Sequence, residues 1–317
     1  MQQAPYSVDF DNGITAIDVE YVRPMLDASH LVLHRGRAAF VDTGTSHSVP
    51  GLLKAMADRG ISPEQVDYVF VTHVHLDHAG GAGALMQALP KAMAVVHPRG
   101  ARHLAEPEKL IAGTRAVYGD EAFERMYGDI IPIPAERIHV PEDGETLELA
   151  GRPLRVMFTE GHARHHYCLA DPEGSGVFTG DSFGISYREL DSDSGPFIFP
   201  TTTPVHFDPE AAHESVDRIM ALAPTYLFPT HFSRIEASPR LAEAMHQCLD
   251  AFVELARKYR DHENRSEMMQ RAMFECLDGR LDANGFTGDQ DQRHRILDDD
   301  VRLNVQGLEF WLDHSDQ

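Results

Sequence analysis

The chain has 317 residues, of which 42% are hydrophobic and 25% charged, as in an ordinary globular protein with one large domain or a domain and an appendage. Its formal net charge of −22 repels phosphate backbones, which excludes nucleic acid as an expected partner. No apolar run approaches the roughly 20 residues that cross a bilayer. No secretory signal opens the chain, so we expect a cytoplasmic protein with no membrane partner.

Short β-strands separated by turn residues are predicted for the first part of the chain, because β-branched and apolar residues dominate there. In order, these strands are expected at 13–22, 30–35, 38–44, 66–72 and 92–98. The run at 66–72 is continuously apolar, which is typical of a strand buried on both faces. Apolar residues spaced three and four apart predict helices at 47–59 and 81–89, and the charged segment 100–127 is helical or irregular.

The next part of the chain alternates strands with turns as far as His231. A hairpin is predicted across Gly151, followed by two strands around the turn at 171–176. Residues 183–207 form a loop rich in Pro, Ser and Asp. Asp208 and Pro209 then open a helix, because Asp is a favoured N-cap and Pro suits the first helical position.

The last part of the chain shows only helical patterns, which are predicted at 240–261, 265–281 and 298–315. We therefore expect a catalytic domain over residues 1–237 and an α-helical region over 238–317. The apolar spacing after residue 300 is amphipathic. That face can extend the core of its own chain, cover the active site as a lid, or form a homodimer interface.

A cluster of potential metal ligands lies where the apolar strand 66–72 ends. His73 and His75 are two residues apart, so in an extended chain both can point at one cation. Asp77 and His78 come where the chain turns into a helix and can point at a second. Two ions need more ligands, and three candidates each end a later apolar run: His162, Asp181 and His231.

These residues resemble the motifs of the metallo-β-lactamase superfamily. The segment "THVHLDHAGG" matches the signature Thr-His-x-His-x-Asp-His-x-x-Gly, and "FVDTG", "EGH", "TGD" and "PTH" follow in the family's order. The resemblance covers about residues 14–235 and implies a four-layer αββα sandwich, here with a C-terminal helical extension. The layout is similar to the glyoxalase II-like branch, although no lactonase-type Tyr follows Asp181 within a few residues.

The resemblance also implies how the ligands divide between two ions. Metal one would be held by His73, His75 and His162, metal two by Asp77, His78 and His231, and Asp181 would bridge both. Imidazole and carboxylate ligands without thiolate suit zinc, iron or manganese, and we expect zinc. Asp77 is the expected catalytic residue, since it can ligate metal two and accept a hydrogen bond from a bridging hydroxide.

The expected function is hydrolysis of a small acyl substrate, such as a thioester or other ester, by the metal-bridging hydroxide. Two alternatives remain open. The ligand set also permits a mono-iron or di-iron protein that binds or reduces oxygen or oxidises a persulfide. The chain can also be a non-catalytic signalling effector that retains the metal site.

Further residues are predicted to support the site. Asp42 is expected to brace the metal loop by hydrogen bonds, and His166 to orient a ligand. Phe183, Tyr187 and His206 lie on the long loop after Asp181 and are candidates for the substrate pocket. The other histidines, His30 and His97 among them, are expected to be surface or loop residues.

Overall fold

The computed structural model describes residues 6–203 and 205–314, and within these ranges the chain forms two compact units. The first unit contains residues 6–158, 165–180 and 224–234, and the second contains the described parts of 159–164, 181–223 and 235–314. The long loop after Asp181 thus groups with the C-terminal helices. The predicted boundary at residue 237 and the homodimer remain predictions.

The first unit contains a seven-stranded sheet whose strands follow one another in sequence order. Strands β1 to β4 are antiparallel neighbours, whereas β4, β5, β6 and β7 are parallel. Parallel strands end at the same edge of a sheet, which brings the loops after β4 and β5 together. The strands are β1 (Ser7–Asp9), β2 (Ile14–Asp18), β3 (Ala28–His34), β4 (Arg37–Val41), β5 (Val66–Val71), β6 (Met93–Val96) and β7 (Ile138–His139).

The same unit contains most of a second sheet, in the order β12-β11-β10-β9-β8. Its strands are β8 (Thr146–Leu149), β9 (Arg152–Phe158), β10 (Tyr167–Asp171), β11 (Gly176–Gly180) and β12 (Tyr226–Pro229). The antiparallel pairing of β8 with β9 confirms the hairpin predicted across Gly151. Strands β11 and β12 are parallel, so the residues that follow them leave the sheet at one edge.

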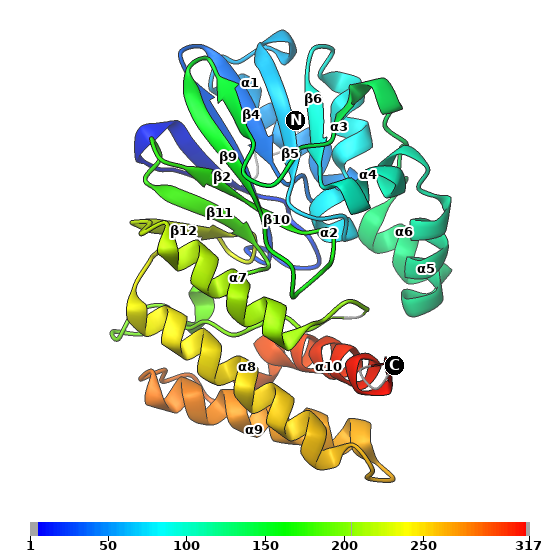
Figure 1. The fold of residues 1–317 in the computed structure, drawn as a ribbon, viewed down its shortest axis with the longest axis vertical. Helices are drawn as coiled ribbons and strands as arrows, with labels where there is room; N and C mark the ends of the chain where they lie inside the picture. Colours follow the sequence, from blue (N-terminus) through cyan, green and yellow to red (C-terminus); the bar gives the residue numbers. More distant parts are fainter. Residues whose placement is uncertain (1–5, 204, 315–317) are drawn as a thin grey trace. The chain divides into compact units, whose positions relative to one another are not determined.

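Apolar side chains fill both faces of the first sheet. Phe70 and Val95 project from it into a buried cluster with Val156, Leu169 and Phe178 of the second sheet. The other face packs against helices, which Figure 1 shows beside β5 and β6. These helices are α1 (Val49–Asp58), α2 (Leu76–Ala79), α3 (Ala82–Ala88), α4 (Pro98–Ala105), α5 (Glu108–Tyr118) and α6 (Asp120–Tyr127).

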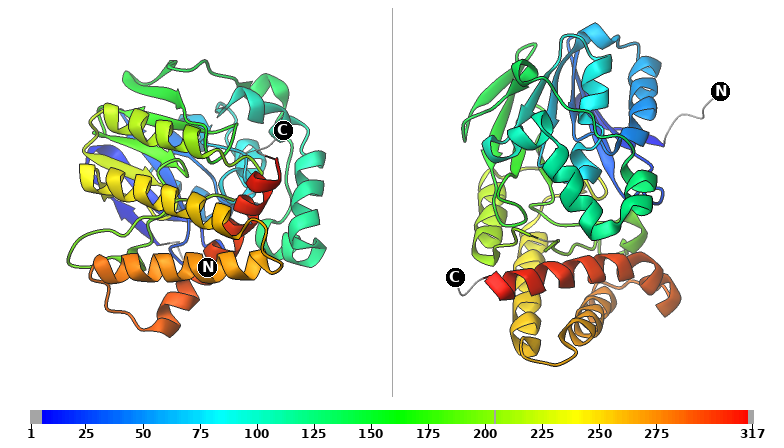
Figure 2. Two further views of the ribbon diagram at one scale, coloured as in Figure 1. Left: turned by 60° about the horizontal axis from the view of Figure 1, so that its bottom comes forward. Right: turned by 90° about the vertical axis from the view of Figure 1, so that its right-hand side faces the viewer.

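The second unit is mostly helical. Helices α8, α9 and α10 pack against one another, and α7 packs on α8 (Figure 2). As predicted, Asp208 caps α7, since its Oδ1 accepts a hydrogen bond from Ala211 N at 3.1 Å. The elements are α7 (Pro209–Ala221), β13 (Ile235–Glu236), α8 (Pro239–Tyr259), α9 (Arg265–Ala283) and α10 (Gln290–His314). In the described ranges, no helix has the length and apolarity to cross a membrane.

The predicted start of the last helix at residue 298 is wrong, because α10 begins at Gln290. Its first turns are polar and show no apolar spacing. They are stabilised by Asp289, whose Oδ1 accepts from Gln292 N at 2.8 Å, and by Arg293, which is 6% exposed and pairs with Asp282 at 2.8 Å. Short 3-10 turns lie at 11–13, 46–48, 63–65, 135–137 and 188–190.

The expectation that His30 is a surface or loop residue is wrong, because it is buried inside a strand, whereas His97 is a loop residue, as expected, and is also buried. His30 lies inside β3, with its ring centroid 5.2 Å from that of Phe178 and 5.6 Å from that of Phe228. The His97 Nδ1 atom accepts a hydrogen bond from Arg99 N at 3.1 Å and so caps α4. Both imidazoles therefore have structural roles that their sequence spacing does not reveal.

Replacing His30 with Gln is expected to make the protein less sensitive to acid. Burial lowers the pKa of His30 from 6.5 to about 4. Between these values the unfolded chain binds a proton that the folded chain does not, so folding stability falls as pH decreases from 6.5 to 4. The wild type should lose about 3 kcal/mol more than His30→Gln between pH 7 and pH 4 in urea titrations. Equal losses in both proteins would contradict a buried neutral His30.

Candidate metal centre

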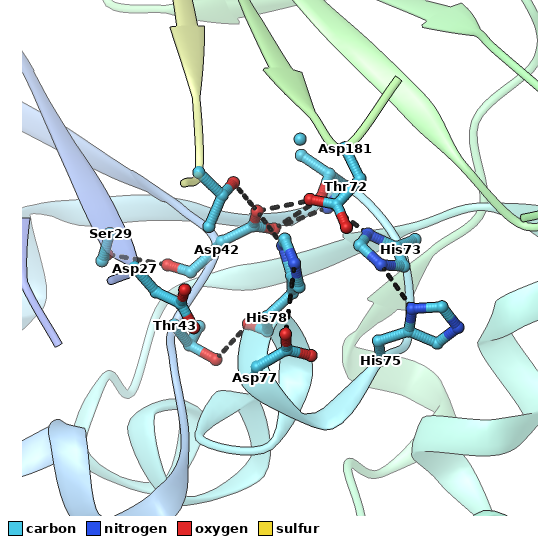
Figure 3. A network of polar contacts seen from close by, with 12 residues as sticks. Asp27, Ser29, Asp42, Thr43, Thr72, His73, His75, Asp77, His78 and Asp181 are labelled. Atoms are coloured by element: carbon cyan, nitrogen blue, oxygen red, sulfur yellow. Dashed lines mark hydrogen bonds and ion pairs between the residues drawn. The ribbon is translucent and has the colours of Figure 1, made fainter. Parts of the chain in front are cut away.

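Two histidines meet in the loop that follows β5. Strand β5 ends at Val71, and α2 begins at Leu76, directly after the extended residue His75. His73 is fully buried, and its Nε2 atom lies 2.9 Å from Nδ1 of His75 (Figure 3). The structure therefore brings together the two side chains whose spacing of two residues predicts a common direction.

A second group of potential ligands forms at the same edge of the first unit. One ligand atom each of Asp77, His78 and His231 lies within 4.8 Å of the others. Asp77 and His78 belong to the first turn of α2, and His231 follows β12 after one intervening residue. The loops after β5 and β12 thus supply this group from positions far apart in the sequence.

The separations within this group fit a shared cation. Asp77 Oδ2 lies 3.8 Å from His78 Nε2 and 3.9 Å from His231 Nε2. These distances are too long for hydrogen bonds. Two atoms bonded to one zinc ion at about 2.0–2.2 Å in tetrahedral geometry are separated by roughly 3.4 Å. Small side-chain rotations therefore suffice for all three residues to bind one ion.

The carboxylate of Asp42 connects the two groups of histidines. It is fully buried, and its oxygens accept hydrogen bonds from Thr72 N at 2.8 Å, His78 Nδ1 at 2.8 Å and Thr230 Oγ1 at 2.7 Å (Figure 3). Its bond to Nδ1 leaves Nε2 of His78 as the atom directed toward Asp77. Asp42 also adopts φ 56°, a left-handed conformation that Asp tolerates better than most residues.

Thr72 extends these contacts to His73. Its Oγ1 lies 2.9 Å from both carboxylate oxygens of Asp42 and 3.2 Å from Nδ1 of His73. His166 is also fully buried and stacks on His73 with ring centroids 4.9 Å apart. Gly180 is required beside them, since a Cβ there would lie 2.5 Å from His166 Nε2 and its φ is 49°. His73 is thus fixed by a hydrogen bond and by packing.

Asp27 is a site residue that the sequence did not indicate. It is completely buried just before β3, and its Oδ1 lies 2.5 Å from Nδ1 of His231. Burial raises its pKa to about 6, although the neighbouring His231 acts in the opposite direction. The pairing directs Nε2 of His231 toward Asp77, as carboxylates commonly do for metal-binding histidines. A lone acidic residue before a strand gives no signal for this role.

The other two predicted ligands, His162 and Asp181, belong to the second unit. Both are buried, and Nε2 of His162 lies 3.4 Å from Oδ2 of Asp181. Nδ1 of His162 is 3.3 Å from the carbonyl oxygen of Thr201, to which it donates when it carries the hydrogen. This bond leaves Nε2 available as a ligand atom. The assignment of both residues to the same centre as His73 and His78 remains a prediction.

The predicted pocket residues also lie in the second unit. Phe183 is fully buried, and Tyr187 is 1% exposed and donates a hydrogen bond from its hydroxyl to Asp300 Oδ1 at 3.2 Å. His206 is half-buried. Their contact with a substrate remains a prediction.

Helix α10 anchors the loop that contacts His162. Asn304 is 1% exposed, and its side chain accepts a hydrogen bond from Thr202 N and donates one to Pro200 O at 3.3 Å. The helix approaches this loop closely at Gly307, where a Cβ would lie 1.5 Å from the carbonyl oxygen of Thr202. The C-terminal helix therefore fixes the peptide between Thr201 and Thr202, whose carbonyl oxygen contacts the predicted ligand His162.

Replacing Asn304 with Leu is expected to weaken metal binding about tenfold, because positioning groups around ligands typically contribute that much. The unpaired Thr202 N should also lower the free energy of unfolding by about 1–3 kcal/mol. Chelator competition measures the first effect and urea titration the second. Val305→Ala is the control, since it opens a cavity in the same buried helix face and leaves the loop contacts intact. Equal metal affinities of the two variants would contradict the positioning role.

Sequence comparison identifies relatives along most of the chain. A model described as metallo-beta-lactamase superfamily matches residues 24–231. The metallo-beta-lactamase fold-containing protein ST1585 of Sulfurisphaera tokodaii is 28% identical over 236 residues, which cover 73% of this chain and 81% of that protein. A hydroxyacylglutathione hydrolase of Synechococcus sp. (strain JA-3-3Ab) is 30% identical over 145 residues, or 46% of this chain and 43% of the hydrolase.

Solved structures show the same fold. The crystal structure of ST1585 from Sulfolobus tokodaii has a TM-score of 0.63 at 24% identity and covers 94% of this chain and 98% of its own. The metallo-beta-lactamase family protein TTHA1429 from Thermus thermophilus has a TM-score of 0.61 at 22% identity, over 96% of this chain and 94% of its own. The predicted fold class, a sandwich with a C-terminal helical extension, is confirmed. With more than half of its length matched by the family's model, the chain belongs to the metallo-beta-lactamase superfamily.

Proposed function

We propose that the chain is a hydrolase with two zinc ions that cleaves a small acyl substrate, a thioester or other ester. The observation that carries the proposal is the group of Asp77, His78 and His231, whose ligand atoms converge within 4.8 Å. Its superfamily consists mostly of metal-dependent hydrolases. A relative over 46% of the chain is described as a hydroxyacylglutathione hydrolase.

Covalent connections support one dinuclear centre. The ring centroid of His165 lies 5.7 Å from that of His75 within the first unit. His162 is three residues before His165, so their Cα atoms are at most roughly 11 Å apart. Asp181 directly follows Gly180, where an added Cβ would lie 2.5 Å from His166 Nε2 and 2.8 Å from Thr72 Oγ1. The proposal therefore assigns His162 and Asp181 to one centre with the histidines after β5.

The donors available are imidazole and carboxylate groups, which suit zinc, iron and manganese. When bound, two such ions supply an activated water and polarise the carbonyl group that it attacks. Asp42 and Asp27 hold the imidazoles of His78 and His231 in the tautomer that exposes Nε2. Asp77 offers one oxygen to this group, and its second oxygen can accept a proton from the attacking water.

Replacing Asp77 with Ala should lower turnover by at least about 10²-fold, because it removes a ligand and a proton acceptor together. The measurement is hydrolysis of a panel of thioesters, esters, lactones and phosphodiesters by zinc-loaded protein. Asp58→Ala is the matched control, since Asp58 is exposed and pairs with Lys54 on the surface of α1. Far-UV circular dichroism should show that both variants retain the fold.

Three results would contradict the proposal. The first is full activity of Asp77→Ala. The second is a zinc-loaded protein that cleaves nothing in the panel. The third is a protein that retains iron through purification and consumes oxygen, which would support the redox alternative.

A further inference from the structure

A second cluster of metal-binding side chains lies on the surface of the second unit, where α7 packs on α8. Each helix contributes a histidine and, four residues later, an aspartate: His213 and Asp217 on α7, and His246 and Asp250 on α8. Residues four apart lie on the same helix face. None of these four residues belongs to the candidate metal centre.

The two imidazoles face each other through their Nδ1 atoms. These atoms are 2.6 Å apart, and the rings are nearly parallel with centroids 4.9 Å apart. Such a short contact requires one hydrogen between the two nitrogens. On the far side of each ring, His213 Nε2 lies 3.2 Å from Asp250 Oδ1, and His246 Nε2 lies 3.1 Å from Asp217 Oδ1.

The carboxylates determine which ring nitrogens can bind a metal ion. An Nε2 atom that donates its hydrogen to a carboxylate leaves Nδ1 as the ligand atom of that ring, and a carboxylate behind a histidine is the usual arrangement around a bound metal. Here the arrangement occurs twice, with both Nδ1 atoms directed at one point. The imidazoles are 29% and 24% exposed, so an ion can reach them from solvent.

We propose that His213 and His246 bind one divalent transition-metal ion through their Nδ1 atoms, with water completing its coordination. The ion replaces the shared hydrogen, which leaves as a proton, and both Nε2 hydrogens stay on their carboxylates. Two nitrogens on one ion at about 2.0–2.1 Å are roughly 3.3 Å apart, so the rings move apart by a fraction of an ångström. The ion thereby cross-links α7 to α8, and the two carboxylates and the acidic chain favour a cation there.

The test uses Cu²⁺, which imidazole sites bind most tightly among these ions. Protein loaded with only the two equivalents of zinc that the candidate metal centre requires is titrated with Cu²⁺ and followed by electron paramagnetic resonance, with zinc release measured in parallel. We expect one bound Cu²⁺ with two nitrogen ligands, no zinc release and a higher melting temperature. His213→Ala and His246→Ala should each abolish this signal. Asp217→Asn and Asp250→Asn should weaken binding by about 10–100-fold.

His262→Ala is the control, because His262 is an exposed histidine just beyond α8 and should leave the signal unchanged. The proposal is overturned if the wild type binds no Cu²⁺ with two nitrogens, or if the signal survives in either His213→Ala or His246→Ala. It is also overturned if copper binds only as zinc is released. Activity is not part of the readout, so failure of the hydrolase proposal leaves this test unaffected.

Discussion

Replacing Asp42 with Ala is expected to lower the free energy of unfolding by about 3–5 kcal/mol and to reduce metal affinity by more than about 10-fold. The substitution leaves buried donors of Thr72, His78 and Thr230 without their acceptor. His78 then loses the bond that directs Nε2 toward Asp77. Urea titration measures the first effect, and chelator competition with zinc measures the second.

Asp42→Asn is the comparison that separates the causes. Asn keeps the size of the side chain and tolerates φ 56° as Asp does, but it has only one acceptor oxygen for these donors. Its losses should therefore lie between those of the wild type and Asp42→Ala. Wild-type metal affinity in both variants would show that Asp42 does not orient the ligands.

Replacing Arg152 with Met is expected to cost about 3–5 kcal/mol of folding stability without affecting the site directly. Arg152 is 1% exposed and forms a bidentate pair with the fully buried Asp171. It also donates to Asn12 O at 2.6 Å, which joins the second sheet to the start of β2. Met preserves much of the volume but leaves the Asp171 charge buried and uncompensated. Urea titration at pH 7 measures the loss.

The double variant Arg152→Met/Asp171→Leu tests this explanation. Replacing both members of a buried ion pair with apolar residues is often neutral, so the double variant should recover most of the stability lost in Arg152→Met. It should not recover all of it, because Gly174 N loses its bond to Asp171 Oδ1. Equal or greater destabilisation in the double variant would show that lost packing, not the isolated charge, explains the effect.

The sequence predicted the parts of the structure that depend on local pattern. The strand before His73 was recognisable because its apolar run is continuous, and the helix after Asp208 because its N-cap and Pro are adjacent in sequence. The histidines after β5 were recognisable because their spacing is short and the motif is specific. Each of these signals lies within about ten residues of chain.

The parts that were missed depend on contacts between distant segments. Asp27 meets His231 across 204 residues, and Asn304 meets Thr202 across 102. Neither has a neighbour in sequence that marks its role. His30 looked like a surface residue because histidine is usually polar and exposed, but the phenylalanines that enclose it come from β11 and β12. The positions of such residues become apparent only when the strands have assembled into sheets.

In the proposed dinuclear centre, the position of Asp42 between His78 and Thr72 would couple the occupancy of the two ion sites. An ion held by His78 would favour the carboxylate position that, through Thr72, keeps the ring of His73 in place. A second ion would then bind to a side chain that is held in position, and linkage requires the reverse effect to be equally large. Partially loaded protein should therefore consist mainly of empty and doubly loaded molecules, and the singly loaded form should be scarce.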